Sequence, residues 1–398
     1  MSERWMMDKT EDAEQFLQGI VERENRFLAA AAAIVKSGGS LWIWGNGMVA
    51  ERAAWWLNYA KIPFDGFLVN EAYYSPDAGS DVFCFEEVCR SASSASVNLV
   101  VAFSGYRPEM LNAFRDKIGQ VIEMDVGAGM THYAGETVFS YPWLESVAEE
   151  LSETYRLLAD QLSRDTMAAY CNQKISLDYR YLEAVRRPPE NQYFDPELIR
   201  FADHEILVNC GAYTGDSAEA FVKAIQKSGG DYSEIISFEP SPCHFEKCVG
   251  RNLPRHRCLR MGCSDAPGRI LFHDDGTSSA AFLPASAADE NALEVDTIDN
   301  VLAGGRATFI KMDIEGAELS ALKGAEKTIR AWKPLLAICA YHKPEDLIKI
   351  PRFIRSLVPE YRWYLRAYHR AAIEVVLYAI PPDRLPGAER RERRAGIA

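Results

Sequence analysis

The stretch LVNCGAYTGDSAEAF, from Leu207 to Phe221, contains the pattern from which the fold can be predicted. Its apolar first part predicts a strand, Gly211 and Gly215 predict a tight turn, and the last part predicts a helix. Glycine at such a turn allows positive φ and a close approach of backbone to a ligand. The helix start adds free backbone N–H groups. A plain tight turn in an α/β protein would have the same pattern, so the remaining sequence must decide.

Short apolar segments alternate with helical segments around this turn, which predicts a parallel sheet with helical crossovers. The expected strands are EILVNC, EIISFEP, HRCLRMGC, ATFIKM and LLAICAY, with GRILFHDD as an extra strand on an excursion. Near the end, YRWYLRAY and EVVLYAI are separated by only about five residues. Parallel neighbours need a crossover of a dozen or more residues. These two strands must therefore form an antiparallel hairpin, at the sheet edge or inserted in the sheet.

Polar residues follow the second and third of these strands. Glu239 ends EIISFEP, 28 residues after Gly211, where a carboxylate can accept hydrogen bonds from both hydroxyls of a ribose. Ser264 and Asp265 in GCSDAPG come after the third strand and could meet an adenine edge. Ligands of open α/β sheets bind at the carboxyl ends of the strands, so these residues predict a nucleoside-bearing cofactor.

Two observations favour S-adenosylmethionine over a nicotinamide dinucleotide as this cofactor. The turn lacks the G-x-G-x-x-G pattern that a dehydrogenase prefers. The terminal hairpin suits a methyltransferase sheet, in which the seventh strand is inserted antiparallel.

Residues 192–380 resemble the FkbM-type methyltransferases. The motifs that carry the resemblance are, in order, YFDPELIRF, VNCGAYTGD, FEPSP, GCSDAPGRILF, EVDTIDNVL, ATFIKMDIEGAELSALKGA, KPLLAICAYHKPEDL and LYAI. FIKMDIEGAE followed by LKGA is the most specific of them. Members of the family look like S-adenosylmethionine-dependent O-methyltransferases, which often act on sugar or polyketide hydroxyls.

The resemblance implies a class I methyltransferase sheet and a set of cofactor-binding residues, with Gly211, Gly215 and Asp216 around the methionine moiety. The complete expected set is Asn209, Gly211, Ala212, Gly215, Asp216, Glu239, Ser264, Asp265 and Asp313. One residue departs from the family pattern, which usually has Asp where this chain has Asn209. Asn keeps the size and an acceptor oxygen but loses the charge, so a weaker hold on the cofactor is expected.

The chemistry requires a group that takes the proton of an acceptor hydroxyl, or a metal that helps to release it. FIKMDIEGAE offers Asp313, at the end of the fourth strand, and Glu315, in the following loop. His342 follows the fifth strand and suits proton abstraction near neutral pH. The alternatives are that Asp313 pairs with Lys311 or caps a helix, and that His342 is an ordinary surface histidine.

Two further ideas concern the same region. Asp313, Glu315 and His342 could together hold a divalent cation, but spacing alone does not establish such a site and no metal is assigned. His273 and Asp274, after the third strand, are weaker candidates for the acceptor side.

A first glycine turn, WGNGMVAERAAWWL, fits G-x-G-x-x-A with Gly45, Gly47 and Ala50. Glu71 lies 26 residues after Gly45, near the end of the next strand, and could bind a ribose. This turn is a candidate second site, for a nicotinamide dinucleotide or a nucleotide sugar. The alternative is a Rossmann-like domain that binds nothing and orients the acceptor or a partner subunit.

The predicted organisation has two Rossmann-like α/β units joined by helix. A helix from Trp143 to about Lys174 is amphipathic, and either packs on its own domains or forms a homo-oligomer contact. The expected parts are an N-terminal helix (1–37), a Rossmann-like domain (38–142), a helical linker (143–195), a methyltransferase domain (196–382) and a flexible tail (383–398).

The composition limits the partners. A net charge of −13 over 398 residues argues against nucleic acid or an anionic membrane surface. No signal peptide and no apolar run long enough to span a bilayer are found. The nine cysteines are scattered, odd in number and without a CxxC pair, which predicts reduced thiols in a cytoplasmic protein and neither a disulfide framework nor a zinc site.

The sequence therefore predicts an S-adenosylmethionine-dependent O-methyltransferase that acts on a hydroxyl of a sugar, a glycoconjugate or a related small molecule. One alternative is an oxidoreductase that uses the N-terminal domain to bind NAD(P) or a nucleotide sugar. A second is a non-catalytic S-adenosylmethionine-binding protein, which Asn209 favours.

Overall fold

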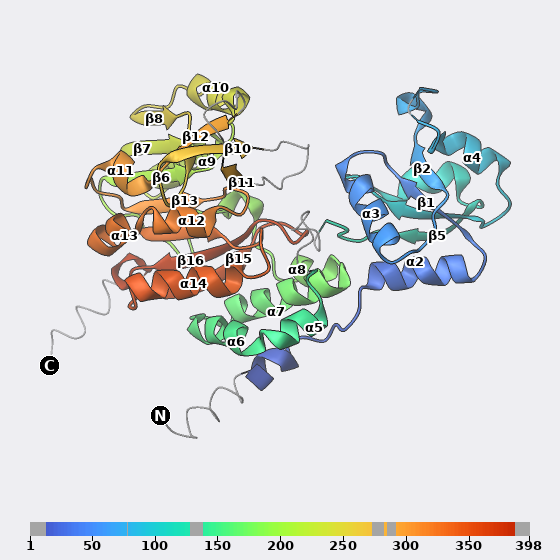
Figure 1. Cartoon of the computed structure of the whole chain (residues 1–398), viewed down its shortest axis with the longest axis horizontal. Helices are drawn as coiled ribbons and strands as arrows, with labels where there is room; N and C mark the ends of the chain where they lie inside the picture. Colours follow the sequence, from blue (N-terminus) through green and yellow to red (C-terminus); the bar gives the residue numbers. More distant parts are fainter. Residues whose placement is uncertain (1–12, 78, 128–137, 273–281, 285–291, 387–398) are drawn as a thin grey trace.

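The computed structural model describes residues 13–77, 79–127, 138–272, 282–284 and 292–386. Two large sheets lie at opposite ends of the molecule, and a group of helices lies beside and between them (Figure 1). The chain is therefore an α/β protein with one parallel and one mixed sheet of the Rossmann-like type. No helix of the described ranges has the length and apolar character needed to cross a membrane.

The N-terminal sheet has five parallel strands in the order β3-β2-β1-β4-β5. The strands are β1 (Ser40–Trp44), β2 (Gly66–Val69), β3 (Val82–Cys84), β4 (Val97–Val101) and β5 (Ile118–Ile122). The helices of this unit are α2 (Arg26–Lys36), α3 (Met48–Tyr59) and α4 (Phe85–Ser91). Strand order changes direction at β1, which pairs with both β2 and β4, as in doubly wound folds.

The single N-terminal helix expected before Ser37 is interrupted. Residues 13–18 are helical, the chain then leaves the helix, and α2 starts afresh at Arg26. The cause is Asn25, whose side-chain oxygen accepts a hydrogen bond from the Leu28 N–H and so caps a new helix.

The helix expected over 143–174 is also divided. It consists of α5 (Tyr141–Ser146), α6 (Ala148–Leu157) and α7 (Gln161–Ser176), followed by α8 (Arg180–Glu183). Asp160 caps α7 by accepting from the Ser163 N–H. The break before it pairs with the methyltransferase sheet, because the Ala159 N–H donates to the Trp363 carbonyl. Tertiary pairing with a strand thus overrides a continuous helical pattern.

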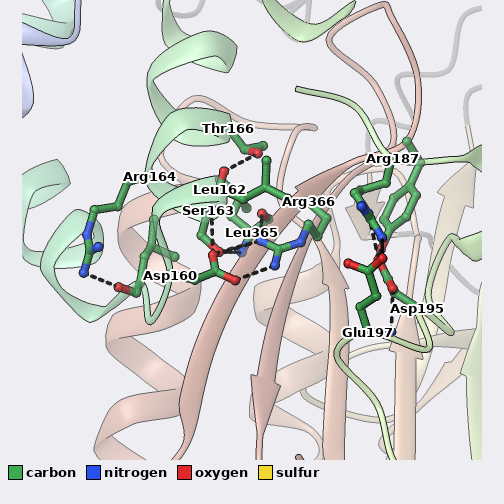
Figure 2. Close-up of polar contacts among 12 residues, drawn as sticks. Asp160, Leu162, Ser163, Arg164, Thr166, Arg187, Asp195, Glu197, Leu365 and Arg366 are labelled. Atoms are coloured by element: carbon green, nitrogen blue, oxygen red, sulfur yellow. Dashed lines mark hydrogen bonds and ion pairs between the residues drawn. The ribbon is translucent and has the colours of Figure 1, made fainter. Parts of the chain in front are cut away.

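Figure 2 shows the hydrogen bonds and ion pairs that connect this helical group to the edge strand β15 (Arg362–Ala367). The buried Arg366 guanidinium donates to Asp160 Oδ2 at 2.6 Å and to Ser163 Oγ at 2.7 Å. Nearby, Arg187 pairs with Asp195 and Glu197. The edge of the sheet is therefore covered by other parts of the chain, as edge strands require.

The C-terminal sheet has seven strands in the order β15-β16-β14-β13-β6-β7-β8. Besides β15, they are β6 (Glu205–Cys210), β7 (Tyr232–Phe238), β8 (His256–Leu259), β13 (Phe309–Met312), β14 (Leu335–Cys339) and β16 (Val375–Ile380). Strand β16 runs antiparallel to both β14 and β15. The predicted terminal hairpin is confirmed, and its second strand is inserted into the sheet.

Helices cover both faces of this sheet. They are α9 (Asp216–Lys227), α10 (Pro242–Gly250), α11 (Ile298–Leu302), α12 (Glu318–Lys323), α13 (Glu326–Trp332) and α14 (Asp346–Leu357). Alternate residues of a strand join different cores, as period-2 geometry requires. In β13, Phe309 belongs to the core under α9, and Ile310 belongs to the core under α12 to α14.

The expected strand HRCLRMGC is two strands in different sheets. Strand β8 ends at Leu259, and β9 (Gly262–Cys263) joins a second sheet, ordered β11-β10-β12-β9. Its other strands are β10 (Gly268–Phe272), β11 (Phe282–Pro284) and β12 (Ala292–Asp296). After β8 the chain leaves the seven-stranded sheet because β9 pairs with β12. The sequence around β8 could not indicate this pairing, because β12 lies far along the chain. His273 and Asp274 lie outside the described residues.

Candidate active site

A cavity of about 500 Å³ lies at the carboxyl ends of β6, β7 and β13, a size typical of small-molecule sites. Its wall includes residues from the turn after β6, the ends of β7 and β13, and the loop before β16. Sequence-predicted residues in the wall are Gly211, Asp216, Glu239, Asp313 and Glu315. The sheet thus brings together strand ends that are up to about 100 residues apart in sequence.

Glu239 lies directly after β7 on one side of the cavity. One carboxylate oxygen accepts from the Tyr213 N–H at 2.7 Å, and the other accepts from the Ser241 N–H at 3.0 Å. Burial raises the pKa of Glu239, although these two backbone N–H groups favour its charged form. A carboxylate has about four acceptor positions, so Glu239 keeps capacity for two hydroxyl donors from a ligand.

Gly211 is needed for a reason inside the protein. It has φ +75°, and a Cβ at this position would lie 1.8 Å from the Asp313 carbonyl oxygen. The turn after β6 therefore presses against the end of β13, which brings the cofactor turn and Asp313 together. Gly211 also lines the cavity. The absence of a side chain therefore allows the contact with β13 and also leaves the Gly211 backbone accessible to a ligand.

The rest of this turn prepares the start of α9. Ala212 is buried, and its N–H donates to the Phe238 carbonyl. Gly215, at φ +81°, is the N-cap of α9, and Asp216 is its first residue, facing the cavity. A carboxylate at a helix N-terminus is favourably placed relative to the helix dipole.

Asn209 lies behind the cavity wall and is fully buried. Its side-chain amide donates to Ser237 Oγ at 3.2 Å, and its oxygen accepts from Ser217 Oγ at 3.2 Å. Ser217 lines the cavity. Asn209 thus reaches the site through Ser217, and the expected loss of cofactor affinity stays a prediction about an indirect effect.

Ser264 and Asp265 are held beside the cavity by α12. The Asp265 N–H donates to Ser320 Oγ at 3.2 Å. The cavity wall on this side contains Gly262 and Cys263, the two residues of β9. Ser264 and Asp265 directly follow these two residues, and their contact with adenine stays a prediction.

Asp313 lies opposite Glu239 and receives two tyrosine hydroxyls. Tyr193 donates to Oδ2 at 2.8 Å, and Tyr341 donates to Oδ1 at 3.2 Å. Burial opposes the charge of Asp313, but Lys311, His342 and the Tyr193 hydrogen bond outweigh burial and lower its pKa. Lys311 itself donates to the Gly211 carbonyl at 2.6 Å, so its ammonium stabilises the glycine turn. The alternative in which Lys311 serves only to pair with Asp313 therefore describes part of its contacts.

His342 is buried among three carboxylates. Nδ1 lies 3.0 Å from Glu318 Oε1, and Nε2 lies 3.4 Å from Glu315 Oε2 and 3.6 Å from Asp313 Oδ1. Burial disfavours the charged imidazole, but these carboxylates outweigh burial and raise the pKa of His342 well above its ordinary value. The raised pKa favours the protonated ring, which counts against His342 as the proton acceptor, and that role stays a prediction.

Sequence reasoning missed three acidic or hydroxyl groups of this site. Tyr193 comes from the connector before the sheet, and Glu374 comes from the loop before β16. Glu318 is completely buried beside His342 and accepts from the Ile314 N–H at 2.9 Å. Tyr193 and Glu318 lie in the quoted family motifs, and Glu374 begins the expected strand EVVLYAI. None of these residue types stands out in a sequence until the strands are ordered.

Four residues of the cavity wall have unusual backbone angles. Tyr193, Tyr213, Glu315 and Glu374 all have φ between +48° and +65°. Non-glycine residues rarely adopt this region, and where they do the strain is often found at functional sites. The backbone angles of these four residues therefore set the directions of their side chains in the cavity wall.

The first glycine turn is explained by packing. Gly45 has φ +128°, and a Cβ there would lie 2.6 Å from the Ala102 carbonyl oxygen. Gly47 is the N-cap of α3. The Glu71 side chain is exposed and pairs with Arg90 at 3.4 Å. These contacts account for the motif without a ligand, and nucleotide binding at Gly45, Gly47 and Glu71 stays a prediction.

Comparison with known proteins agrees with this geometry. Residues 209–368 match the model of the methyltransferase FkbM domain. The crystal structure of the methyltransferase FkbM from Methylobacillus flagellatus KT is similar over 94% of this chain and 98% of that chain, with a TM-score of 0.67 and 21% identity. The trans-methyltransferase CalH in complex with SAH aligns over 60% of this chain and 65% of that chain, with 12% identity and a TM-score of 0.26.

The CalH likeness is too weak to support an inference, and no curated protein matches the sequence significantly. At 21% identity the Methylobacillus structure shows a shared fold. The family match begins at Asn209, near the end of β6, and ends just after β15, so it includes Glu239 and Asp313. The chain therefore carries a methyltransferase domain of the FkbM family over residues 209–368.

Proposed function

We propose that the protein is an S-adenosylmethionine-dependent O-methyltransferase whose acceptor is a hydroxyl of a sugar, a glycoconjugate or a related small molecule. The observation that carries the proposal is one cavity at three neighbouring strand ends, in the order β13-β6-β7. Glu239 lies on the β7 side, Asp313 and the carboxylates around it lie on the β13 side, and the Gly211 turn lies between them. In this proposal residues 196–382 form the catalytic unit, 143–195 the linker and 38–142 an accessory Rossmann-like unit.

The residues of the β7 side fit an adenosyl cofactor. Glu239 has free acceptor positions for ribose hydroxyls, and Gly262 and Cys263 offer a surface without long side chains for the base. Asp216 and Asp313 are placed to receive the ammonium group and the positive sulfur. When bound, the cofactor supplies an activated methyl group.

The residues of the β13 side fit an acceptor hydroxyl. Carboxylate oxygens of Asp313 and Glu374 lie within 4.8 Å of each other. Two such groups cannot both ionise easily, and their pKa values are driven apart. Lys311 and His342 stabilise the Asp313 anion, whereas burial and the charge of Asp313 raise the pKa of Glu374 to about 7.

Glu374 is therefore the group best suited to accept the proton. A base is most effective when its pKa lies near the working pH. The side-chain amide of Gln192 contacts Glu374 and can orient it. Glu374 would take the proton of the acceptor hydroxyl, and the cofactor, when bound, would supply the methyl group.

Calorimetric titration tests the cofactor, and a labelled-methyl screen tests the reaction. Titration with S-adenosylmethionine should give one site per chain, and NAD should give none at this cavity. A panel of glycosides and polyhydroxylated small molecules should contain an acceptor that becomes labelled on oxygen. Binding of NAD without S-adenosylmethionine would contradict the proposal. Tight binding of S-adenosylmethionine with no labelled acceptor would favour a non-catalytic binding protein.

A further inference from the structure

Three side chains that the proposed reaction does not use meet between α10 and the edge strand β8. Cys248 lies near the end of α10, and His256 and Cys258 lie two residues apart on β8, so they share one face of that strand. The sulfur atoms of Cys248 and Cys258 are 3.2 Å apart. One ligand atom from each of the three residues lies within 4.8 Å of the other two.

The distances suit a common ion. A zinc ion binds sulfur at about 2.3 Å and imidazole nitrogen at about 2.0 Å, usually in tetrahedral geometry. Two such sulfurs are about 3.8 Å apart, and a sulfur and a nitrogen are about 3.5 Å apart. The observed distances are 3.2 Å between the sulfurs and 3.8 Å from Cys258 Sγ to His256 Nδ1. Shifts of about 0.6 Å or less would bring these two distances to the zinc values, and the third pair, Cys248 and His256, lies within 4.8 Å.

The ring of His256 lies beside the Cys258 sulfur. Its Nε2 lies 2.8 Å from Ser237 Oγ and 3.4 Å from Cys258 Sγ, and its Nδ1 lies 3.8 Å from the same sulfur. When Nε2 donates to Ser237, Nδ1 is the nitrogen that can bind an ion. A metal-binding histidine ordinarily uses its second nitrogen in such a hydrogen bond.

The charge balance also favours a cation. Cys248 is fully buried, and the neighbouring Arg251 is paired with Glu219 and the Thr214 carbonyl. Two thiolates and a divalent cation are neutral together, so binding buries no net charge. Each thiol would release its proton to solvent.

We propose that Cys248, His256 and Cys258 form a binding site for a thiophilic divalent cation of the zinc type, with water at the fourth position. Soft sulfur and imidazole ligands select such ions over magnesium or calcium. The sequence did not indicate this site, because His256 and Cys258 with a cysteine ten residues before Cys258 match no usual zinc spacing. This inference is independent of the proposed methyl transfer.

The site lies directly behind the cofactor turn. A Cβ at Gly215 would be 3.2 Å from Cys248 Sγ. Ser237, which holds His256, also accepts from Asn209, and Asn209 accepts from the cavity residue Ser217. A bound ion would fix α10 to β8 at the back of the turn, so metal and cofactor binding should influence each other reciprocally.

Titration with Co²⁺ and Zn²⁺ alone tests the site in the full-length, metal-free and reduced protein. We expect one Co²⁺ per chain with thiolate-to-cobalt charge-transfer absorption, its displacement by Zn²⁺, and release of about two protons per ion at neutral pH. Cys248→Ser and Cys258→Ser should each abolish the absorption. Cys243→Ser, on the exposed face of the same helix, is the matched control and should bind as the native protein does.

Ser237→Ala tests the orientation of His256 without touching a ligand, and should weaken binding about tenfold. Because Cys248→Ser could disturb folding, proton release by the native protein and the half-buried Cys258→Ser provide readouts that do not depend on it. Absence of a stoichiometric ion in the native protein would overturn the proposal, as would loss of binding in Cys243→Ser. A peroxide-induced disulfide between Cys248 and Cys258 in a protein that binds no ion would show a redox pair instead.

Discussion

Glu239 stabilises the turn after β6, and in the proposed function it also binds the ribose of the cofactor. Its two oxygens accept from the Tyr213 and Ser241 N–H groups, so the carboxylate is fixed before a ligand arrives. Preorganisation of this kind reduces the ordering cost of binding. The same arrangement means that the carboxylate charge matters to the ligand and to the turn.

Glu239→Gln should weaken S-adenosylmethionine binding by about ten- to a hundredfold. Hydrogen bonds to a charged group contribute about 1.5–3 kcal/mol, and about 1.4 kcal/mol corresponds to a factor of ten. Calorimetric titration measures the change. Glu234→Gln, on the same strand but exposed and paired with Arg257, should leave the dissociation constant as it is. An unchanged constant in Glu239→Gln would remove Glu239 from the cofactor site.

Glu374→Gln should lower kcat while leaving the dissociation constant of S-adenosylmethionine nearly unchanged. General bases contribute about 10²- to 10⁴-fold, and a loss in that range is expected with the acceptor found in the methyl-transfer screen. In the native protein kcat should rise as pH rises through about 7, because Glu374 ionises there. The variant should lose this rise, and Glu360→Gln, an exposed glutamate before β15, should keep it.

The titration of Glu374 also has a defined effect on stability. Its folded-state pKa of about 7 lies above the ordinary value of 4.5, so the folded state favours the protonated form. This contribution is complete below pH 4.5 and is lost as pH rises through about 7. Glu374→Gln should remove that part of the pH dependence in denaturant unfolding. A native profile without such a decline would mean that Glu374 ionises normally.

Most cofactor-side residues could be read from the sequence, because they follow strands that are continuous in the chain. Glu239 and Asp313 end apolar strands, and the order of those strands at one edge follows from parallel pairing. Glu374, Tyr193 and Glu318 could not be read in this way. Their positions depend on which side chains face one another around the cavity, and so does the group of carboxylates around His342.

At the scale of elements, the turn between β6 and α9 depends on its contact with β13. Gly211→Ala would place a methyl group 1.8 Å from the Asp313 carbonyl oxygen at φ +75°. The main chain would have to move, and the loss of stability should exceed the roughly 1 kcal/mol typical of positive-φ substitutions. Thermal and denaturant unfolding measure this loss, together with cofactor affinity.

Gly250→Ala is the matched control for this element. Gly250 ends α10, has no atom near the position of a Cβ, and its φ is ordinary. Alanine favours helix over glycine by up to about 1 kcal/mol, so this variant should be neutral or slightly more stable. If Gly211→Ala were as stable as Gly250→Ala, the proposed contact between the turn and β13 would be wrong.

The elements themselves were predictable where periodicity and connection length act locally. The seven strands of the C-terminal sheet and the terminal hairpin follow from apolar runs and a short connection. The break before Arg26 has a local cause, the Asn25 cap, whereas two other errors occur where a distant partner decides. Ala159 leaves its helix to pair with Trp363, and Gly262 leaves its strand to pair with Val295. No local pattern contains these partners.

For the whole molecule, Asp125 connects all three parts of the fold. It follows β5 of the N-terminal unit and is buried. Its Oδ2 accepts from Gln173 Nε2 of α7 at 2.8 Å and from the Ala372 N–H at 2.6 Å. Ala372 belongs to the β15–β16 loop, which also carries Glu374. The N-terminal unit thus supports the loop that positions the proposed base, although it lies at the other end of the molecule (Figure 1).

Asp125→Ala should therefore affect catalysis more than cofactor binding. The substitution leaves the Ala372 N–H without its acceptor, which costs about 1–3 kcal/mol for a buried group left unpaired. Gln173 Nε2 loses one of two acceptors and keeps the Arg370 carbonyl. The loop should then hold Glu374 less firmly, so kcat should fall while Glu239 and the cofactor affinity are spared. Asp125→Asn retains one acceptor oxygen, so its kcat should lie between those of Asp125→Ala and the native protein.

Asp116→Ala, at an exposed aspartate of the same unit, is the control and should match the native protein in unfolding and turnover. If Asp125→Ala weakened S-adenosylmethionine binding and left kcat intact, the N-terminal unit would support the cofactor side and not the loop of Glu374.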